Sequence, residues 1–203
     1  MTVFYNTFMK TITFVTSNKT KLLHAQEALS DMGYKVTSKQ INIIEPREED
    51  PEKVAAEKAT QAFTQIQGPL MVEDSGIFIR ALNGFPKTFV HFALDTIGVA
   101  NIVKLMAGVS DRYVEFRQAL AYIGPGMDEP KIFSYIDGNF SLADKVWVPL
   151  YDGGDFDKIL IPPGESQPLC MFDKQWRAKR DAAMNQETIH YRQLARWLGE
   201  LKK

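Results

Sequence analysis

The sequence has 203 residues, 45% of them hydrophobic, so it can bury one sizeable core and we expect one compact unit. A formal net charge of −1 provides no basic surface for neutralising phosphate backbones, so we expect no nucleic-acid partner. The single cysteine, Cys170, excludes an intrachain disulfide, which favours a reducing, cytoplasmic setting. The three scattered histidines and the one cysteine do not have the spacing of a zinc site.

We expect neither a membrane span nor a signal peptide in this sequence. No apolar stretch approaches the length of a membrane span, so we expect no membrane partner. Residues 1–8 lack the charged region and cleavage site of a signal peptide, and we interpret them as an extension that precedes one domain over residues 9–203.

The first motif is a strand, a polar turn and a helix. Residues 11–15 are strand-like, residues 16–21 form a turn with Lys19 and Lys21, and apolar positions then recur at helical spacing: Leu22, Ala25, Leu29 and Met32. Because a helix N-terminus has unpaired N–H groups and a partial positive charge, the turn predicts an anion site. The alternative is an ordinary strand-to-helix turn with solvated lysines, and the pattern is not a Walker A loop.

A second strand is predicted over residues 34–44, followed by an acidic loop over 45–51. Asp50 and Pro51 suit a helix start, and Gly68-Pro69 ends that helix. Glu45 in the loop is a weak metal candidate, because most clustered carboxylates are simply solvated. Lys58 lies at the edge of the apolar helix face, where it either extends to solvent or reaches into a cleft.

Two adjacent carboxylates follow a short apolar run. Residues 70–72 predict a buried strand that stops at Glu73-Asp74-Ser75-Gly76. Carboxylates at a strand end can bind Mg²⁺ through oxygen or orient a water for attack, and Gly76 lets backbone approach a ligand closely. The alternative is an acidic turn that caps the next element.

The rest of the chain predicts a further segment over 77–82, a turn at 83–86 and one long helix that ends near Ala107. A long antiparallel hairpin follows over residues 113–123 and 131–143, then turn-rich residues 147–163 with strand-like 159–161, and a final helix over about 186–201. Helices and strands alternate before the hairpin, which predicts a mixed-sheet α/β fold.

Three residues of the second half are candidates for ligand contact. Arg192 shares a helical face with Ile189 and Ala195, so its guanidinium needs an anion, either a substrate phosphate or a protein carboxylate. His190 and Tyr191 are expected to point elsewhere. Phe156 and Asp157 follow a glycine-rich turn and could stack on and hydrogen-bond a base, although an aromatic entering a strand is more often core.

In this order and spacing the motifs resemble the inosine triphosphate pyrophosphatases, from about Thr11 to Leu198. The family's opening Thr-x-Asn-x-x-Lys matches Thr16, Asn18 and Lys21, and its loop glutamate and helix lysine match Glu45 and Lys58. Its acidic-Asp-Ser/Thr-Gly signature is residues 73–76, and the typical Ala-Leu-Asn-Gly-Phe-Pro run follows at 81–86.

The resemblance implies a two-lobed α/β fold around a long mixed sheet, with helices on both faces, a cleft between the lobes, and a homodimer. It implies hydrolysis of unusual purine nucleoside triphosphates to nucleoside monophosphate and pyrophosphate with Mg²⁺. By position, the triphosphate would be held by Thr16, Asn18, Lys21, Ser75 and Gly76. Glu45 and Asp74 would hold the metal and the attacking water, with Asp74 as base; Lys58 would stabilise phosphate charge. Phe156 and Asp157 would flank the purine, and Arg192 would read the purine or its phosphates.

The departures from the family pattern concentrate in the second half. Gly-x-Pro-Gly becomes residues 84–87 with Lys87 last, Tyr-Ser becomes Phe89-Val90, and Gly-aromatic-Asp-Pro becomes residues 155–158. Ser-His-Arg becomes His190-Tyr191-Arg192, and the lysine expected six residues before the arginine is Gln186. The phosphate half therefore matches while the base-reading half is altered, so the preferred base stays open.

Two further hypotheses stay open. A nucleotide-binding or assembly protein with impaired catalysis would keep the fold and the phosphate pocket, since one scaffold hosts altered sites easily. The related Maf-type pyrophosphatases are a poorer match, because their Ser-x-Ser-x-Arg-Arg opening is absent.

Overall fold

The computed structural model describes residues 10–183 and 188–201. Its centre is a seven-stranded sheet in the order β2-β1-β3-β5-β6-β7, with β4 also paired to β3. The strands are β1 (Lys10–Val15), β2 (Tyr34–Lys39), β3 (Leu70–Ile79), β4 (Pro86–Lys87), β5 (Tyr113–Ile123), β6 (Lys131–Leu142) and β7 (Leu160–Ile161). β1 pairs in parallel with β2 and β3, and the other pairs are antiparallel, which confirms the mixed sheet.

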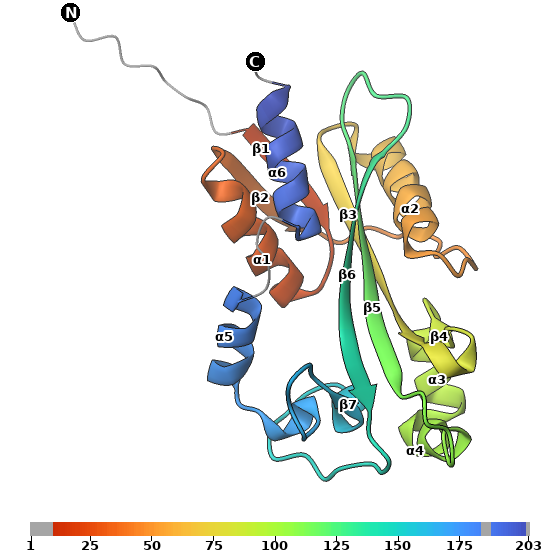
Figure 1. Ribbon diagram of the computed structural model, residues 1–203. Helices are drawn as coiled ribbons and strands as arrows, with labels where there is room; N and C mark the ends of the chain where they lie inside the picture. The colour runs from red at the N-terminus through yellow and green to blue at the C-terminus, as the bar shows by residue number, and fades with distance from the viewer. Residues whose placement is uncertain (1–9, 184–187, 202–203) are drawn as a thin grey trace, which may run out of the picture.

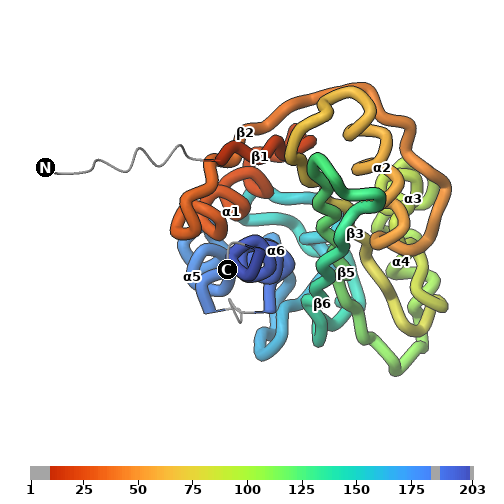
Figure 2. The backbone as a smooth tube through the Cα atoms, turned by 90° about the horizontal axis from the view of Figure 1, so that it is seen from above, coloured from red at the N-terminus to blue at the C-terminus, as the bar shows by residue number. Residues whose placement is uncertain are grey.

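Six α-helices occur in the described residues: α1 (Lys19–Ser30), α2 (Pro51–Ile66), α3 (Val90–Thr96), α4 (Gly98–Leu105), α5 (Lys174–Ala183) and α6 (His190–Glu200). α1 and α6 lie together on one side of the sheet, and α2 lies on the other (Figures 1 and 2). The long strands β3, β5 and β6 continue past these helices to a second group formed by β4, β7, α3 and α4 (Figure 1). The molecule is thus the predicted two-lobed α/β fold.

Three buried clusters correspond to this arrangement. One joins α1 and α6 to the sheet around Phe14, Leu29 and Leu194, and a second joins α2 to the opposite face around Ala59 and Val72. The third fills the other lobe with residues such as Ile79, Ile102 and Leu160. The apolar faces predicted for α1 and α2 are therefore buried against the sheet. This packing fixes the position of the polar residues that the two helices carry beside the sheet.

The predicted end of the third strand is wrong. β3 does not stop at Glu73 but continues to Ile79, and it pairs with β5 along its whole length. Both carboxylates are buried within the strand, with Glu73 9% and Asp74 7% exposed. A strand accommodates two buried charges only when cations lie beside them, and the sequence shows those cations only in distant segments.

Other boundaries also differ from the prediction. The long helix expected to end near Ala107 is two helices, α3 and α4, because Ile97 precedes a left-handed Gly98 (φ +71°). β2 ends at Lys39 rather than residue 44, and α5 was not predicted at all. The final helix begins at His190; Gln186 and the proposed extension over residues 1–8 lie outside the described residues. No described helix is long and apolar enough to span a membrane.

Candidate active site

The turn after β1 is organised by its own polar side chains. Asn18 is the N-cap of α1, and its Oδ1 accepts hydrogen bonds from the backbone N–H groups of Thr20 (2.9 Å) and Lys21 (3.1 Å). Thr16 Oγ1 in turn accepts from the Asn18 N–H at 3.1 Å. Two of the N–H groups expected to bind an anion are thus already satisfied, and the Asn18 amide nitrogen and the lysine ammonium groups are further donors at this turn.

Beside this turn, one edge of β3 is not covered by another strand. On that side β1 pairs with β3 only at Leu70 and Met71, and β4 pairs only at Ile77 and Phe78. No described strand pairs there with residues 72–76, the stretch that contains the acidic motif. Gly76 is required for packing rather than only for ligand approach, because a Cβ there would lie 2.5 Å from the Lys87 carbonyl oxygen.

Three of the predicted residues meet on the α2 side of β3. Lys58 Nζ lies 3.1 Å from Asp74 Oδ1 and 3.5 Å from Glu45 Oε1, so one ammonium bridges both carboxylates. The Asp74 side chain is buried while Glu45 is exposed. Burial raises the pKa of Asp74 above its usual range, and the ammonium of Lys58 only partly opposes this effect. A carboxylate with a raised pKa is a better proton acceptor for water than an ordinary one.

Glu73 faces the other side of β3, where it binds both α1 and α6. Its Oε1 lies 3.1 Å from Lys21 Nζ, and its Oε2 accepts a hydrogen bond from the Tyr191 hydroxyl. His190 Nε2 lies 3.4 Å from the same Oε2 without hydrogen-bond geometry, so we treat it as an electrostatic contact. His190 and Tyr191, expected to point elsewhere than Arg192, are 1% and 4% exposed and contact this carboxylate.

The charges around Glu73 determine its ionisation. Burial by itself raises the pKa of Glu73, but His190, Lys21 and Tyr191 together lower it to about 2, so the carboxylate is ionised at neutral pH. The same burial and the neighbouring carboxylate raise the pKa of Tyr191. The sequence offered one signal for this network, the i, i+3, i+4, i+7 spacing of Tyr191, Leu194, Ala195 and Leu198, which all lie on the buried face of α6.

A pocket of about 410 Å³ opens at the N-terminus of α6. It lies between α1, α5, α6 and the long hairpin, and its lining includes Gln118, His190, Tyr191 and Arg192. The Arg192 side chain is 34% exposed, with Nη1 3.2 Å from the Ala28 carbonyl oxygen and 3.7 Å from Asp31 Oδ2. Arg192 therefore has protein partners and also lines the pocket. Both alternatives for its anionic partner, a protein carboxylate and a substrate phosphate, are compatible with this position.

Phe156 and Asp157 lie in the second lobe. The Phe156 ring is buried in the core cluster with Ile159 and Leu160. Asp157 Oδ2 accepts a hydrogen bond of 2.9 Å from Arg177 on α5. Neither residue lines the pocket at α6.

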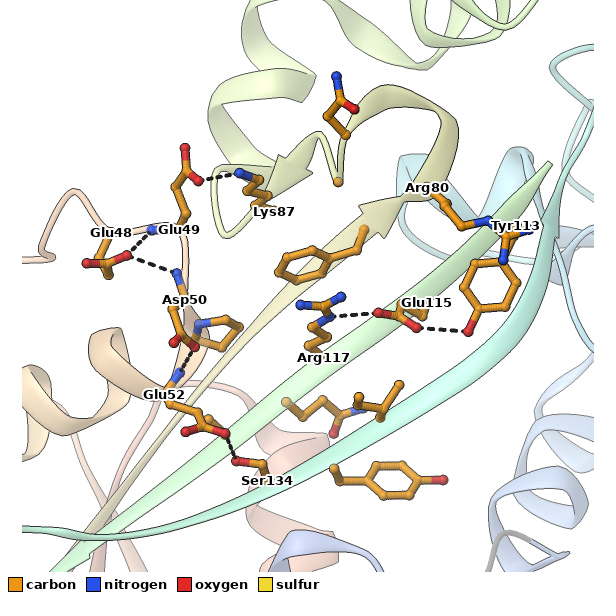
Figure 3. A pocket seen from close by; sticks show the side chains of 18 residues that line it. Glu48, Glu49, Asp50, Glu52, Arg80, Lys87, Tyr113, Glu115, Arg117 and Ser134 are labelled. Carbon is orange, nitrogen blue, oxygen red and sulfur yellow. Dashed lines mark hydrogen bonds and ion pairs between the residues drawn. The ribbon is translucent and has the colours of Figure 1, made fainter. Parts of the chain in front are cut away.

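Another hollow, of about 930 Å³, lies on the α2 side near β4, and none of the predicted site residues lines it (Figure 3). Its charged side chains bind one another: Lys87 pairs with Glu49, and Glu115 accepts from both Arg117 and Tyr113 (Figure 3). The Asp74 carboxylate lies outside this hollow.

The residues around Asp74 fit a hard divalent cation. The described residues contain no group of three or more metal-binding side chains, so protein atoms alone do not form a complete site. Glu45 and Asp74 nevertheless converge on one cationic atom, and Mg²⁺ commonly binds one or two carboxylates and completes its shell with water and substrate phosphates.

The chain was compared with known proteins. The model of the Ham1 family matches residues 12–185. A dITP/XTP pyrophosphatase of Methanothermobacter marburgensis is 40% identical over 154 residues, 75% of this chain and 79% of that protein. A dITP/XTP pyrophosphatase of Hyperthermus butylicus is 31% identical over 94% of this chain and 96% of its own. The Ham1 protein structure of Staphylococcus aureus aligns with a TM-score of 0.75 at 20% identity, covering 96% of this chain and 100% of its own.

Proposed function

This chain belongs to the Ham1 family, and we propose that it hydrolyses unusual purine nucleoside triphosphates to nucleoside monophosphate and pyrophosphate. The observation that carries this proposal is the buried Asp74 carboxylate bridged by Lys58 to Glu45, next to the uncovered edge of β3. Relatives over most of the chain are dITP/XTP pyrophosphatases, which supports the same substrate class.

In this proposal, some residues around β3 bind the substrate and others activate the attacking water. Asn18, Lys21 and the backbone at Ser75 and Gly76 bind the triphosphate beside the uncovered edge of β3. Asp74 accepts a proton from the water that attacks the phosphate chain, and its raised pKa suits that role. Lys58 orients Asp74 in the resting protein and stabilises the charge that develops on the phosphates.

Glu45 and Asp74 would hold Mg²⁺ through their carboxylate oxygens, since both already bind the same cationic group. When bound, the metal ion neutralises phosphate charge and polarises the bond that breaks. The protein supplies the opposing carboxylate pair, and the burial of Asp74 makes a compensating positive charge at this place favourable.

The nucleoside end extends toward the pocket at the N-terminus of α6, where Arg192 contacts the base or its phosphates. Glu73 connects this pocket to the phosphate turn, because its two oxygens contact α6 on one side and Lys21 on the other. The roles expected for Phe156 and Asp157 beside the purine have less support, since one is in the core and the other is bound to Arg177.

The resemblance also implies a homodimer that acts in the cytoplasm, and we include both in the proposal. Light scattering coupled to size-exclusion chromatography, at several protein concentrations, tests the dimer directly. A monomer at all concentrations would remove that part and leave the proposed reaction unaffected.

The reaction is tested by pyrophosphate release from ITP, XTP, dITP and the four common NTPs in the presence of Mg²⁺. We expect release from the 6-oxopurine nucleotides and a loss of about 100-fold or more in Asp74→Asn, because a positioned general base contributes about that much. Asp111→Asn is the matched control: its carboxylate pairs with Arg80 on the surface and should leave turnover unchanged. Circular dichroism establishes that both variants fold.

The alternative of a catalytically impaired nucleotide-binding protein gains no observation in its favour. Its motivation was the altered sequence near Gln186 and Tyr191, yet Tyr191 is a bonded, buried part of the candidate site. Binding of ITP without any turnover that depends on Asp74 would reverse this conclusion.

A further inference from the structure

Glu45 lies in a segment outside the helices and strands. Residues 41–47 connect β2 to α2, and within the described part of the chain no backbone-to-backbone hydrogen bond reaches them. The Glu45 side chain is 69% exposed and lies 3.5 Å from Lys58 Nζ. An ion pair this exposed contributes little, so the position of the Glu45 carboxylate depends on other contacts of the segment.

Two glutamines of α2 bind the backbone of this segment. The side-chain amide of Gln61 makes two hydrogen bonds with Ile44: Oε1 accepts from the Ile44 N–H, and Nε2 donates to the Ile44 carbonyl oxygen, both at 2.9 Å. Gln65, one turn further along α2, donates from Nε2 to the Asn42 carbonyl oxygen at 3.1 Å. One amide of Gln61 thus satisfies both backbone polar groups of Ile44, as a neighbouring strand would.

Side chains alternate along this segment. Ile41 and Ile43 pack against the buried cluster between α2 and the sheet, and Glu45 continues the same series toward α2. There it meets Lys58, which lies three positions before Gln61 and therefore on the same face of the helix. A slip of one residue in the backbone that Gln61 holds would turn the carboxylate away from α2.

The far end of the loop is held separately. The Thr88 hydroxyl, just after β4, donates a hydrogen bond to the Glu48 carbonyl oxygen. This contact lies three residues beyond Glu45, whereas the Gln61 contact lies on the residue immediately before it. Of these backbone contacts, the pair made by Gln61 therefore has the most direct effect on the position of Glu45.

We propose that Gln61 is a positioning residue: it fixes the backbone of Ile44 and so directs the Glu45 carboxylate to the metal ion shared with Asp74. This inference rests on the proposed function, because it takes Glu45 and Asp74 as the Mg²⁺ ligands. Gln61 acts through the loop and is not itself a ligand. Replacing a residue that orients a metal ligand typically costs about 10- to 100-fold in metal affinity or activity.

The test compares Gln61→Met with Gln65→Met. Both changes remove an amide and keep an unbranched side chain that suits a helix, and Gln65→Met is the matched control because its hydrogen bond lies three residues from Glu45. We expect the Mg²⁺ concentration for half-maximal ITP hydrolysis to rise about tenfold in Gln61→Met and less than about twofold in Gln65→Met, with kcat at saturating Mg²⁺ little changed. Binding of Mn²⁺ without nucleotide, measured by electron paramagnetic resonance, should weaken by a similar factor.

The alternative role of Gln61 is to stabilise the loop without affecting the metal. A double-mutant cycle with Glu45→Ala separates the two roles, because a residue that acts through Glu45 has no further effect on Mg²⁺ or Mn²⁺ dependence once that carboxylate is absent. The same shift in the Glu45→Ala background overturns the proposal. An unchanged Mg²⁺ dependence in a folded Gln61→Met also overturns it and leaves the proposed hydrolysis intact.

Two further outcomes are decided by the wild type. If Gln61→Met does not fold, amide hydrogen exchange of the wild type decides: a protected Ile44 N–H supports the proposal, and an unprotected one overturns it. If the wild type hydrolyses no nucleotide, the proposed function fails, and the Mn²⁺ dissociation constants test the positioning role separately. Equal constants for the wild type and Gln61→Met, or no Mn²⁺ binding by the wild type, overturn that role.

Discussion

Lys87 occupies a backbone conformation that suits glycine. Its φ is +58°, in the left-handed region, where a side chain normally costs about 1 kcal/mol. The related family has glycine at this position, so the conformation is retained although the residue differs. The Lys87 ammonium pairs with Glu49, whose side chain is largely exposed, and an ion pair of this kind contributes little.

Two substitutions separate the backbone effect from the charge effect. Lys87→Gly and Lys87→Ala both remove the ammonium, but only glycine relieves the left-handed conformation. We expect Lys87→Gly to be more stable than Lys87→Ala by about 1 kcal/mol in urea denaturation. Equal stability of the two variants would show that the backbone at residue 87 relaxes into an ordinary conformation.

Asn18, the N-cap of helix α1, has two roles in the proposed site. Asn18 caps the helix through Oδ1, and we propose that it also contacts the triphosphate. The capping task needs only an acceptor oxygen, which aspartate supplies equally well. The phosphate task does not tolerate a second negative charge. These requirements differ, so substitution can separate them.

We expect Asn18→Asp to keep the thermal stability of the wild type, because aspartate caps well and its charge favours a helix N-terminus. The same variant should raise KM for the Mg²⁺ complex of ITP about tenfold or more through repulsion of the triphosphate. Asn18→Ala should instead lose about 1 kcal/mol of stability through the missing cap. Kinetics and thermal unfolding on the same samples check both, and an unchanged KM in Asn18→Asp would place the phosphates elsewhere.

The continuation of β3 through Glu73 and Asp74 shows where local sequence rules fail. Adjacent carboxylates usually mark a strand end, because isolated buried charges are costly. Here Lys21 comes from α1 and Lys58 from α2, so the compensation arises only after the chain folds. The short helix α5 was missed for a similar reason: none of its residues is buried, and ion pairs such as Arg180–Asp137 attach it to the hairpin.

The sequence predicted the sheet and the main helices of the molecule. It gave Glu45, Lys58 and Asp74 as separate candidates, and only the folded structure shows that Lys58 contacts both carboxylates. The motifs of the proposed phosphate end lie near regular strand and helix boundaries, which local patterns predict. His190 and Tyr191, next to the proposed nucleoside pocket, are buried because α6 packs against α1 and the sheet. Such contacts arise from tertiary packing. The helical spacing of the sequence predicts which residues are buried, but it does not indicate their role in the site.

Glu73 connects the parts of the molecule that the sequence leaves separate. Its carboxylate lies at the centre of the sheet and contacts α1 through Lys21 and α6 through Tyr191. The network therefore contributes to global stability as well as to the geometry of the site. That contribution depends on the charge of Glu73, and hence on pH.

The folded-state pKa of Glu73, about 2, is below its reference value of 4.5, so ionisation favours the folded state. Its contribution, on the order of 3 kcal/mol, is complete above about pH 4.5 and is lost as the pH falls toward 2. Glu73→Gln should therefore be much less stable than the wild type at pH 7, with a difference that shrinks in acid. Urea denaturation between pH 3 and 7 measures this difference.

Asp74→Asn is the control of opposite sign. The raised pKa of Asp74 means that its ionisation opposes folding, so this variant should gain stability relative to the wild type as the pH rises. Parallel pH profiles for Glu73→Gln and the wild type would show that the buried network does not hold α1 and α6 through charge.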